Sequence, residues 1–313
     1  MELMNFKIIL TLLTFSILFA SCSESFEPIT DASQPLVVEG YVEAGPGSVP
    51  TYVILTRALP FITKIGPEQL GELFVNGADV KVSDGDKTVS LTELCLDDLP
   101  EDLQVIVAQS LNLDPDSLQL NICAYVDIAN QLVREEGKSY DLRIETGEEV
   151  LTALTTIPTY IPLYAFRFDD PPGEPSNKYA RLYATIDDPA IEKNFYRYKT
   201  ADGDGPLITP FTSVINDVFF DGQSFEFPLS KAEDLQEEVP FDEFGLFERG
   251  DSITLKWMSI DEAHFNFWNT RDFSANSVGP FSSYTRINGN VDGALGIWGG
   301  YSVDNYRLFV PYK

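Results

Sequence analysis

The sequence predicts a mainly β protein built from two sandwich-like domains. Short runs rich in Val, Ile, Thr, Tyr and Phe recur along the chain, and Gly, Pro and Asp turns separate them. The chain has 313 residues, of which 44% are hydrophobic, so it is long enough for about two domains with their own cores. Helical periodicity is confined to two stretches.

The first domain is expected over residues 35–158, as an immunoglobulin-like β-sandwich. Residues 100–113 carry apolar side chains at helical spacing, which predicts a helical insertion over about 94–121. The strands are expected from β-rich runs bounded by turn residues, at 36–42, 51–57, 74–82, 88–91, 140–145 and 151–157.

The second domain is expected over residues 159–313, after a junction stiffened by Pro158 and Pro162. One conspicuous helix is expected within it, with Ser259 as N-cap and Glu262 completing a capping box. The rest reads as strands at 179–186, 195–199, 219–227 (a hairpin around Asp221-Gly222), 252–258, 294–298 and 305–310.

The N-terminus has the features of an export signal. Lys7 precedes an apolar run over residues 8–20 that is shorter than the about 20 residues of a membrane span. Ala20-Ser21-Cys22 resembles a bacterial lipobox, which implies that residues 1–21 are a signal peptide and that Cys22 is lipidated. A plain signal peptide with an incidental cysteine is the alternative.

Residues 22–34 are expected to form a flexible acidic tether, because they are rich in Ser, Asp, Glu and Pro. The acids after Cys22 resemble the surface-export signal of Bacteroidota lipoproteins. The resemblance implies a lipid-anchored protein of the outer membrane, exposed at the cell surface. The periplasmic leaflet is the alternative location.

Two further cysteines, Cys95 and Cys123, form an even pair in an exported chain, which favours a disulfide over two buried free thiols. The loop that the bridge would close contributes roughly 3–4 kcal/mol in the chain-entropy model.

Charge and histidine content exclude several classes of function. Asp+Glu number 49 and Lys+Arg 21, for a net charge of −28, so a nucleic-acid partner is not expected. The single histidine, His264, excludes multi-histidine metal sites, and without a G-x-S-x-G motif a structural or surface role is favoured. No catalytic motif and no cofactor motif is found.

One turn offers a candidate calcium site. Asp202 and Asp204 flank Gly203 and could ligate calcium through their carboxylates. The later glutamate that completes an EF-hand loop is missing, so a solvated turn is the favoured interpretation.

Six segments along the chain are distinctive: LVVEGYV (36–42), ADVKVSD (78–84), NFYR (194–197), SIDEA (259–263), GPF (279–281) and NGNVDGALGIW (288–298). Together they resemble a family of Bacteroidota lipoproteins known as domain of unknown function 4249, and the resemblance covers nearly all of the chain after Cys22 except the insertion. Such proteins are often encoded beside TonB-dependent receptors.

Together these features predict a non-catalytic cell-envelope lipoprotein that acts as an accessory or ligand-binding partner of an outer-membrane TonB-dependent transporter. Two alternatives remain open. One is a surface hydrolase that acts on carbohydrates or peptides through paired carboxylates. The other is an adhesive or scaffold module of the envelope.

Overall fold

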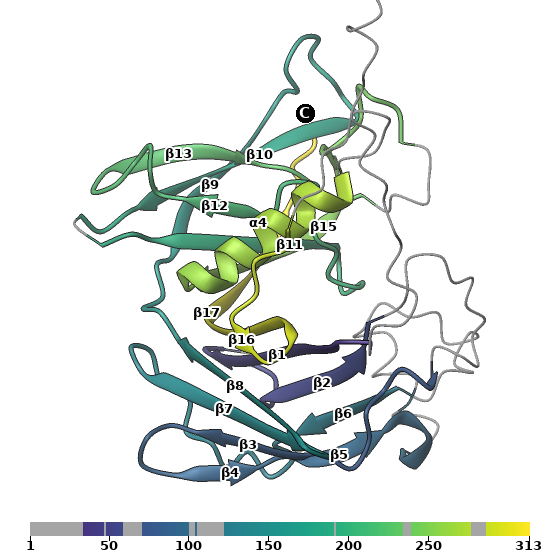
Figure 1. Cartoon of the computed structure of the whole chain (residues 1–313). Coiled ribbons are helices and arrows are strands. Elements are labelled where there is room, and N and C mark those ends of the chain that lie inside the picture. Colours follow the sequence, from purple (N-terminus) through teal and green to yellow (C-terminus); the bar gives the residue numbers. More distant parts are fainter. Residues whose placement is uncertain are drawn as a thin grey trace, which may run out of the picture. The chain divides into compact units, whose positions relative to one another are not determined.

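The computed structural model describes residues 34–46, 48–58, 71–99, 104, 122–190, 192–233, 239–276 and 286–313 (Figure 1). They fall within the unit Gln34–Lys313 of the chain. The expected signal peptide, Cys22 and all of the tether except Gln34 lie outside the described residues. Among the helices that are described, none is both long and apolar enough to cross a membrane.

Within the described residues the strands form three sheets, of eight, four and five strands. The first, here called the large sheet, contains residues from both halves of the sequence. In spatial order its strands are β12 (Val214–Asn216), β11 (Phe195–Asp202), β15 (Ser252–Ile260), β17 (Leu295–Phe309), β1 (Leu36–Ala44), β2 (Tyr52–Arg57), β6 (Cys123–Val126) and β5 (Thr92–Cys95).

The two smaller sheets are named here after a central strand. The β7 sheet has the order β16 (Val291–Asp292), β8 (Glu149–Thr156), β7 (Ser139–Thr146), β3 (Asp79–Ser83) and β4 (Thr88–Ser90). The β10 sheet contains β13 (Ser224–Leu229), β10 (Tyr179–Asp187) and β14 (Phe247–Glu248), and β9 (Leu163–Asp169) also pairs with β10.

Each smaller sheet faces the large sheet across its own hydrophobic core. The N-terminal core joins Val38 and Trp298 of the large sheet to Leu142 of the β7 sheet. The C-terminal core joins Trp257 of the large sheet to Leu182 of the β10 sheet. The period of two along each strand places alternate side chains in these cores. The chain is therefore mainly β with sandwich-like layers, as the sequence predicts.

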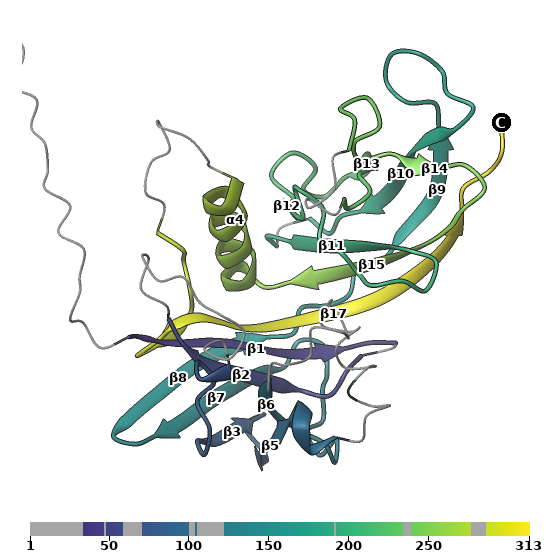
Figure 2. The same ribbon diagram turned by 90° about the vertical axis from the view of Figure 1, so that its right-hand side faces the viewer.

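β17 is shared by the two cores, and Figure 2 shows it running between β1 and β15. It lies parallel to β1 from Leu295 to Ser302 and antiparallel to β15 from Tyr301 to Phe309. The N-terminal core consists mainly of residues before 158, but it also includes Val291 and Trp298. A strand from the end of the sequence therefore contributes to both cores.

The expectation of two separate strands at 294–298 and 305–310 is wrong, because one strand continues through both. Its glycines serve close packing rather than a turn. A Cβ at Gly299 would lie 2.8 Å from Nδ1 of His264, and one at Gly300 would lie 2.6 Å from the carbonyl oxygen of Thr156. Glycine at both positions lets neighbours approach from the two faces of the strand.

The helix α4 (Glu262–Asn276) packs against β11, β12 and β17. Its expected N-cap at Ser259 is wrong: Ser259 lies in β15, and its hydroxyl accepts a hydrogen bond from the backbone N–H of Ile161 at 3.1 Å. Asp261 caps the helix instead, accepting a bond from the backbone N–H of His264 at 2.8 Å. The start moves because β15 keeps pairing with β17 through Ile260.

The hairpin expected over 219–227 is only half present. Residues 224–229 form β13, which pairs with β10. The preceding residues form a tight turn, in which the carbonyl of Asp217 accepts hydrogen bonds from the N–H groups of Phe220 at 2.7 Å and Asp221 at 2.8 Å. These bonds replace the strand ladder that the sequence pattern predicts.

Cys95 and Cys123 form a disulfide and lie opposite each other in β5 and β6. The bridge therefore closes the base of the expected insertion. A short 3-10 turn, η1 (Leu96–Asp98), follows β5. Most of the insertion, including the predicted helix, lies outside the described residues.

Candidate ligand-binding site

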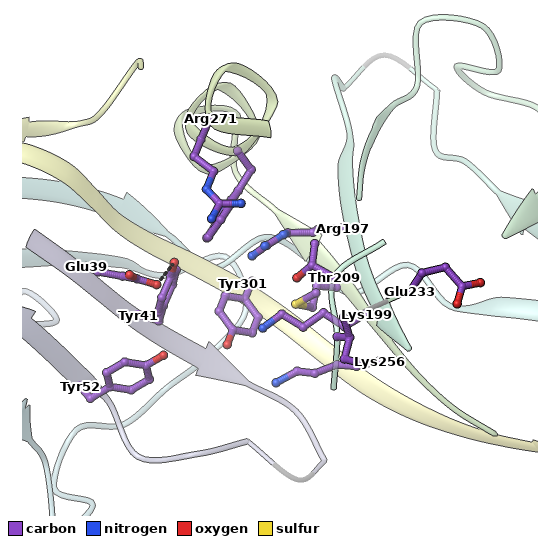
Figure 3. Close-up of a pocket in the computed structure, with 13 residues that line it drawn as sticks. Glu39, Tyr41, Tyr52, Arg197, Lys199, Thr209, Glu233, Lys256, Arg271 and Tyr301 are labelled. Carbon is purple, nitrogen blue, oxygen red and sulfur yellow. Dashed lines mark hydrogen bonds between the residues drawn. The ribbon is translucent and has the colours of Figure 1, made fainter. Parts of the chain in front are cut away.

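A pocket of about 420 Å³ lies on the face of the large sheet that α4 partly covers (Figure 3). Side chains from β1, β2, β11, β15, β17 and α4 line it. Although the whole chain carries a net charge of −28, cationic groups gather here. They are Arg197, Lys199, Lys256 and Arg271.

Strand periodicity explains how β11 supplies two of these cations. Tyr196 and Tyr198 enter the C-terminal core, so Arg197 and Lys199 point to the opposite face. The register then places Lys199 of β11 directly opposite Lys256 of β15. Facing side chains in an antiparallel pair lie about 5 Å apart at Cβ, and like charges there repel.

The guanidinium of Arg197 is buried, and among the described residues no carboxylate forms an ion pair with it, although Asp272 and Glu39 attract it from farther away. The side chain belongs to a residue that is 4% exposed, and its Nε has no hydrogen-bond partner among the described residues. The guanidinium carbon lies 3.5 Å from the centroid of the Trp268 ring in α4. Nε1 of Trp268 is also buried without a described acceptor. Burial lowers the pKa of Arg197, although the group keeps its charge at neutral pH.

The two facing lysines differ in their surroundings. Nζ of Lys256 pairs with the buried carboxylate of Glu43 at 3.1 Å. Lys199 has no such partner in the described part of the chain. Burial, together with repulsion from Arg197 and Lys256, lowers the pKa of Lys199 to about 8. Lys199 is therefore still mostly protonated at pH 7, at a cost to the folded state.

Three tyrosines complete the wall beside the cations. The hydroxyl of Tyr41 donates to the carboxylate of Glu39 at 3.0 Å, as the dashed line in Figure 3 marks. Burial raises the pKa values of Tyr41, Tyr52 and Tyr301 well above 10, and the nearby carboxylates add to the effect. These phenols stay protonated at pH 7. The single donor proton of Tyr41 is already used in the bond to Glu39.

His264 lies beneath the pocket and does not line it. It is fully buried, with its ring centroid 5.5 Å from that of Tyr41 and 5.7 Å from that of Tyr301. Burial lowers its pKa well below 6.5, and Arg197 lowers it further, so the ring is neutral at pH 7. Of the two roles that the sequence favours, structural or surface, the buried position excludes the surface one.

The two candidate calcium residues, Asp202 and Asp204, both form ion pairs within the fold. The carboxylate of Asp202 pairs with Lys231 at 2.9 Å, whereas that of Asp204 pairs with Arg307. A turn lies between them, closed by the bond from the N–H of Gly205 to the carbonyl of Asp202 at 2.9 Å. Each carboxylate therefore has its own cationic partner.

A different group of carboxylates, Asp188, Asp217 and Asp221, does come together, with ligand atoms within 4.8 Å of one another. The carboxylate of Asp217 accepts a bond from the backbone N–H of Asn194 at 2.6 Å. That of Asp188 accepts one from the N–H of Gly222 at 3.3 Å. These bonds hold the turn before β13, which gives the cluster a structural role.

No motif in the sequence marks the pocket's cations. A weaker signal exists: Arg197 and Lys199 alternate with Tyr196 and Tyr198 inside an expected strand, in a chain with only 21 Lys+Arg. A strand whose second face carries cations rather than neutral polar groups is a candidate binding surface. Finding which residues face it requires the register of β11, β15 and β1.

The family described as domain of unknown function (DUF4249) matches residues 23–307, a range that includes every residue of the pocket and both cores except Leu308 and Val310. No curated protein and no solved structure matches the chain significantly.

Proposed function

The chain belongs to the DUF4249 family, and we propose that it is a non-catalytic, ligand-binding lipoprotein of the cell envelope. In this proposal it serves as the accessory partner of an outer-membrane TonB-dependent transporter. The pocket on the large sheet holds the ligand, and the lipid on Cys22 keeps the protein at the membrane.

The observation that carries the proposal is the presence of two cations, Arg197 and Lys199, that line a cavity without described counter-ions. Burying charge without a partner lowers the stability of a fold. Buried charges without partners are found preferentially at functional sites. A ligand that restores the missing contacts explains why these residues line an open cavity.

The positions of the carboxylates in the pocket favour a binding function over a hydrolase function. A glycosidase needs two carboxyl groups that flank one bond. The lining carboxylates are Glu39 and Glu233, and they lie on opposite sides of the cations in Figure 3. Each already accepts a bond within the fold, Glu39 from the hydroxyl of Tyr41 and Glu233 from the N–H of Gly245 at 2.9 Å.

The envelope part of the proposal rests on the sequence. A positively charged start, a short apolar run and Ser21-Cys22 form the pattern of a lipoprotein signal. A single acyl chain binds a membrane only marginally, whereas two or more hold a protein firmly. Multiple lipidation of Cys22 would therefore place the pocket permanently at the membrane surface.

The test is purification of the full chain, tagged after Lys313, from detergent-extracted outer membranes of its own host. We expect the protein to co-purify with a TonB-dependent transporter and to incorporate labelled palmitate. Cys22→Ser should move it to the soluble fraction, whereas the neighbouring change Ser23→Ala should not. Recovery of the wild type alone, or membrane retention of Cys22→Ser, would contradict the proposal.

A further inference from the structure

We propose that the pocket takes an organic carboxylate, with the charged group between Arg197 and Lys199 and the carbon body against the aromatic rings. This inference rests on the proposed function, because it names the ligand class of the same pocket.

Arg197 is the strongest reason to expect an anion. The guanidinium carbon lies 3.5 Å from the centroid of the Trp268 ring, which supplies cation–π attraction but no lone-pair acceptor of the kind that a carboxylate offers. Within the described residues no carboxylate pairs with the guanidinium. A planar carboxylate matches the donor fork of arginine with two parallel hydrogen bonds. A ligand carboxylate in the pocket would accept hydrogen bonds from those N–H groups of the Arg197 guanidinium that face the cavity.

The lysine pair gives a second, independent reason. Lys199 faces Lys256 across the strand ladder, and the carboxylate of Glu43 neutralises only Lys256. An anion beside Lys199 would remove the repulsion that the free pocket carries. Arg197 and Lys199 project from the same face of β11, with Cα atoms roughly 6–7 Å apart along the strand, so one carboxylate can lie between their long side chains.

The local balance of charge favours a singly charged ligand over a polyanion. The pocket's other cations already have partners, in the pairs Lys256 with Glu43 at 3.1 Å and Arg271 with Asp272 at 3.2 Å. Glu39 also lines the pocket and offsets part of the charge of Arg197 and Lys199. The small positive excess that remains suits one carboxylate, and the acidic protein as a whole repels polyphosphates.

The aromatic side chains that line the pocket indicate the uncharged part of the ligand. Tyr52 and Trp268 line the same cavity as the cations, and Figure 3 shows Tyr41 and Tyr301 beside them. Aromatic walls stack on flat or ring-shaped groups, and the indole N–H of Trp268, which has no described acceptor, can donate to a ligand oxygen. A ring-bearing acid therefore uses both features of the pocket.

The experiment compares matched acids and neutral analogues by titration calorimetry on the full chain at pH 7. The probes are phenylacetate with phenylacetamide, galacturonate with galactose, and phenylphosphonate as the phosphate-like arm. We expect at least one carboxylate to bind and its neutral analogue to bind at least about tenfold more weakly. We expect phenylphosphonate to bind no more tightly than that carboxylate.

The variants locate the binding. Lys199→Met should weaken the acid at least about tenfold, because a charge-assisted contact is lost. Lys81→Met, which changes an exposed lysine of β3, is the matched control and should not change the affinity. Arg197→Gln should abolish binding, and Lys199→Met keeps the inference testable if Arg197→Gln does not fold.

Three outcomes would overturn the inference: neither acid binds at about 10 mM, acid and neutral analogue bind equally, or Lys199→Met leaves the affinity unchanged. Equal binding of galactose and galacturonate that Tyr52→Ala abolishes would end the carboxylate inference and leave the proposed binding function intact. The envelope proposal is tested separately: it fails if the Cys22→Ser variant stays in the membrane fraction.

Discussion

Lys199→Met removes a charge that the folded protein holds at a cost, so we expect this variant to be more stable than the wild type in the absence of ligand. Burial lowers the pKa of Lys199 from 10.5 to about 8, with Arg197 and Lys256 adding repulsion. At about 1.4 kcal/mol per pKa unit, the charged form costs the folded state about 3 kcal/mol at pH 7. Methionine keeps most of the apolar stem and avoids that cost.

The pH dependence of stability checks the cause. Between pH 8 and 10 the folded wild type has lost the proton of Lys199, whereas the unfolded chain still binds it. The free energy of unfolding of the wild type should therefore rise with pH in this window. Above pH 10 the buried tyrosines, whose pKa values are raised, act in the opposite direction. Lys199→Met should lack the rise between pH 8 and 10.

The assay is urea unfolding followed by tryptophan fluorescence, at pH 7 and at pH 9.5, without ligand. The control is Lys81→Met, whose exposed side chain should change the unfolding free energy by less than about 0.5 kcal/mol. A Lys199→Met protein that is less stable than the wild type at pH 7, or that keeps the wild-type rise with pH, would refute the reasoning.

Affinity for phenylacetate should fall as pH rises through about 8, because Lys199 loses its proton there while the pocket's tyrosines do not yet titrate; calorimetry that gives equal affinities at pH 7 and pH 9 contradicts this. Glu43→Gln leaves Lys256 buried without its carboxylate and should lower the unfolding free energy by about 3–5 kcal/mol in urea titrations; a change below about 1 kcal/mol argues against a stabilising pair. Replacing Cys95 and Cys123 together by serine should cost about 3–4 kcal/mol in the same assay, and reductant should then have no further effect.

The sequence predicts the strands that depend on local pattern. Alternation places β10 within one residue of its observed end, because alternate side chains of this strand are buried, and the β-rich run at 36–42 places β1 within two residues. The run at 74–82 begins five residues before β3 does. The sequence prediction fails where one residue pattern is typical of two different structures. The pair Gly299-Gly300 is typical of a turn, yet both glycines lie inside β17, where His264 and the backbone of Thr156 leave no room for side chains.

The pocket is harder to predict, because no short segment contains it. Tyr41, Arg197 and Tyr301 are far apart in the sequence, and only the pairing of β1 with β17 and of β15 with β11 brings them together. Such pairings are set by the packing of whole sheets, which local periodicity does not encode. The alternation of Arg197 and Lys199 with core tyrosines is the part of the site that a reader of the sequence can find.

The shared strand β17 has a consequence for synthesis in the cell. A ribosome delivers Val37 long before Leu295, yet the two residues are neighbours in the finished sheet. Until the last segment emerges, β1 and β15 each present an unpaired edge, which is the kind of surface that recruits other chains into aggregates. A nascent product that stops short of residue 295 can complete neither half, so truncated copies should be cleared by proteases rather than accumulate as partly working protein.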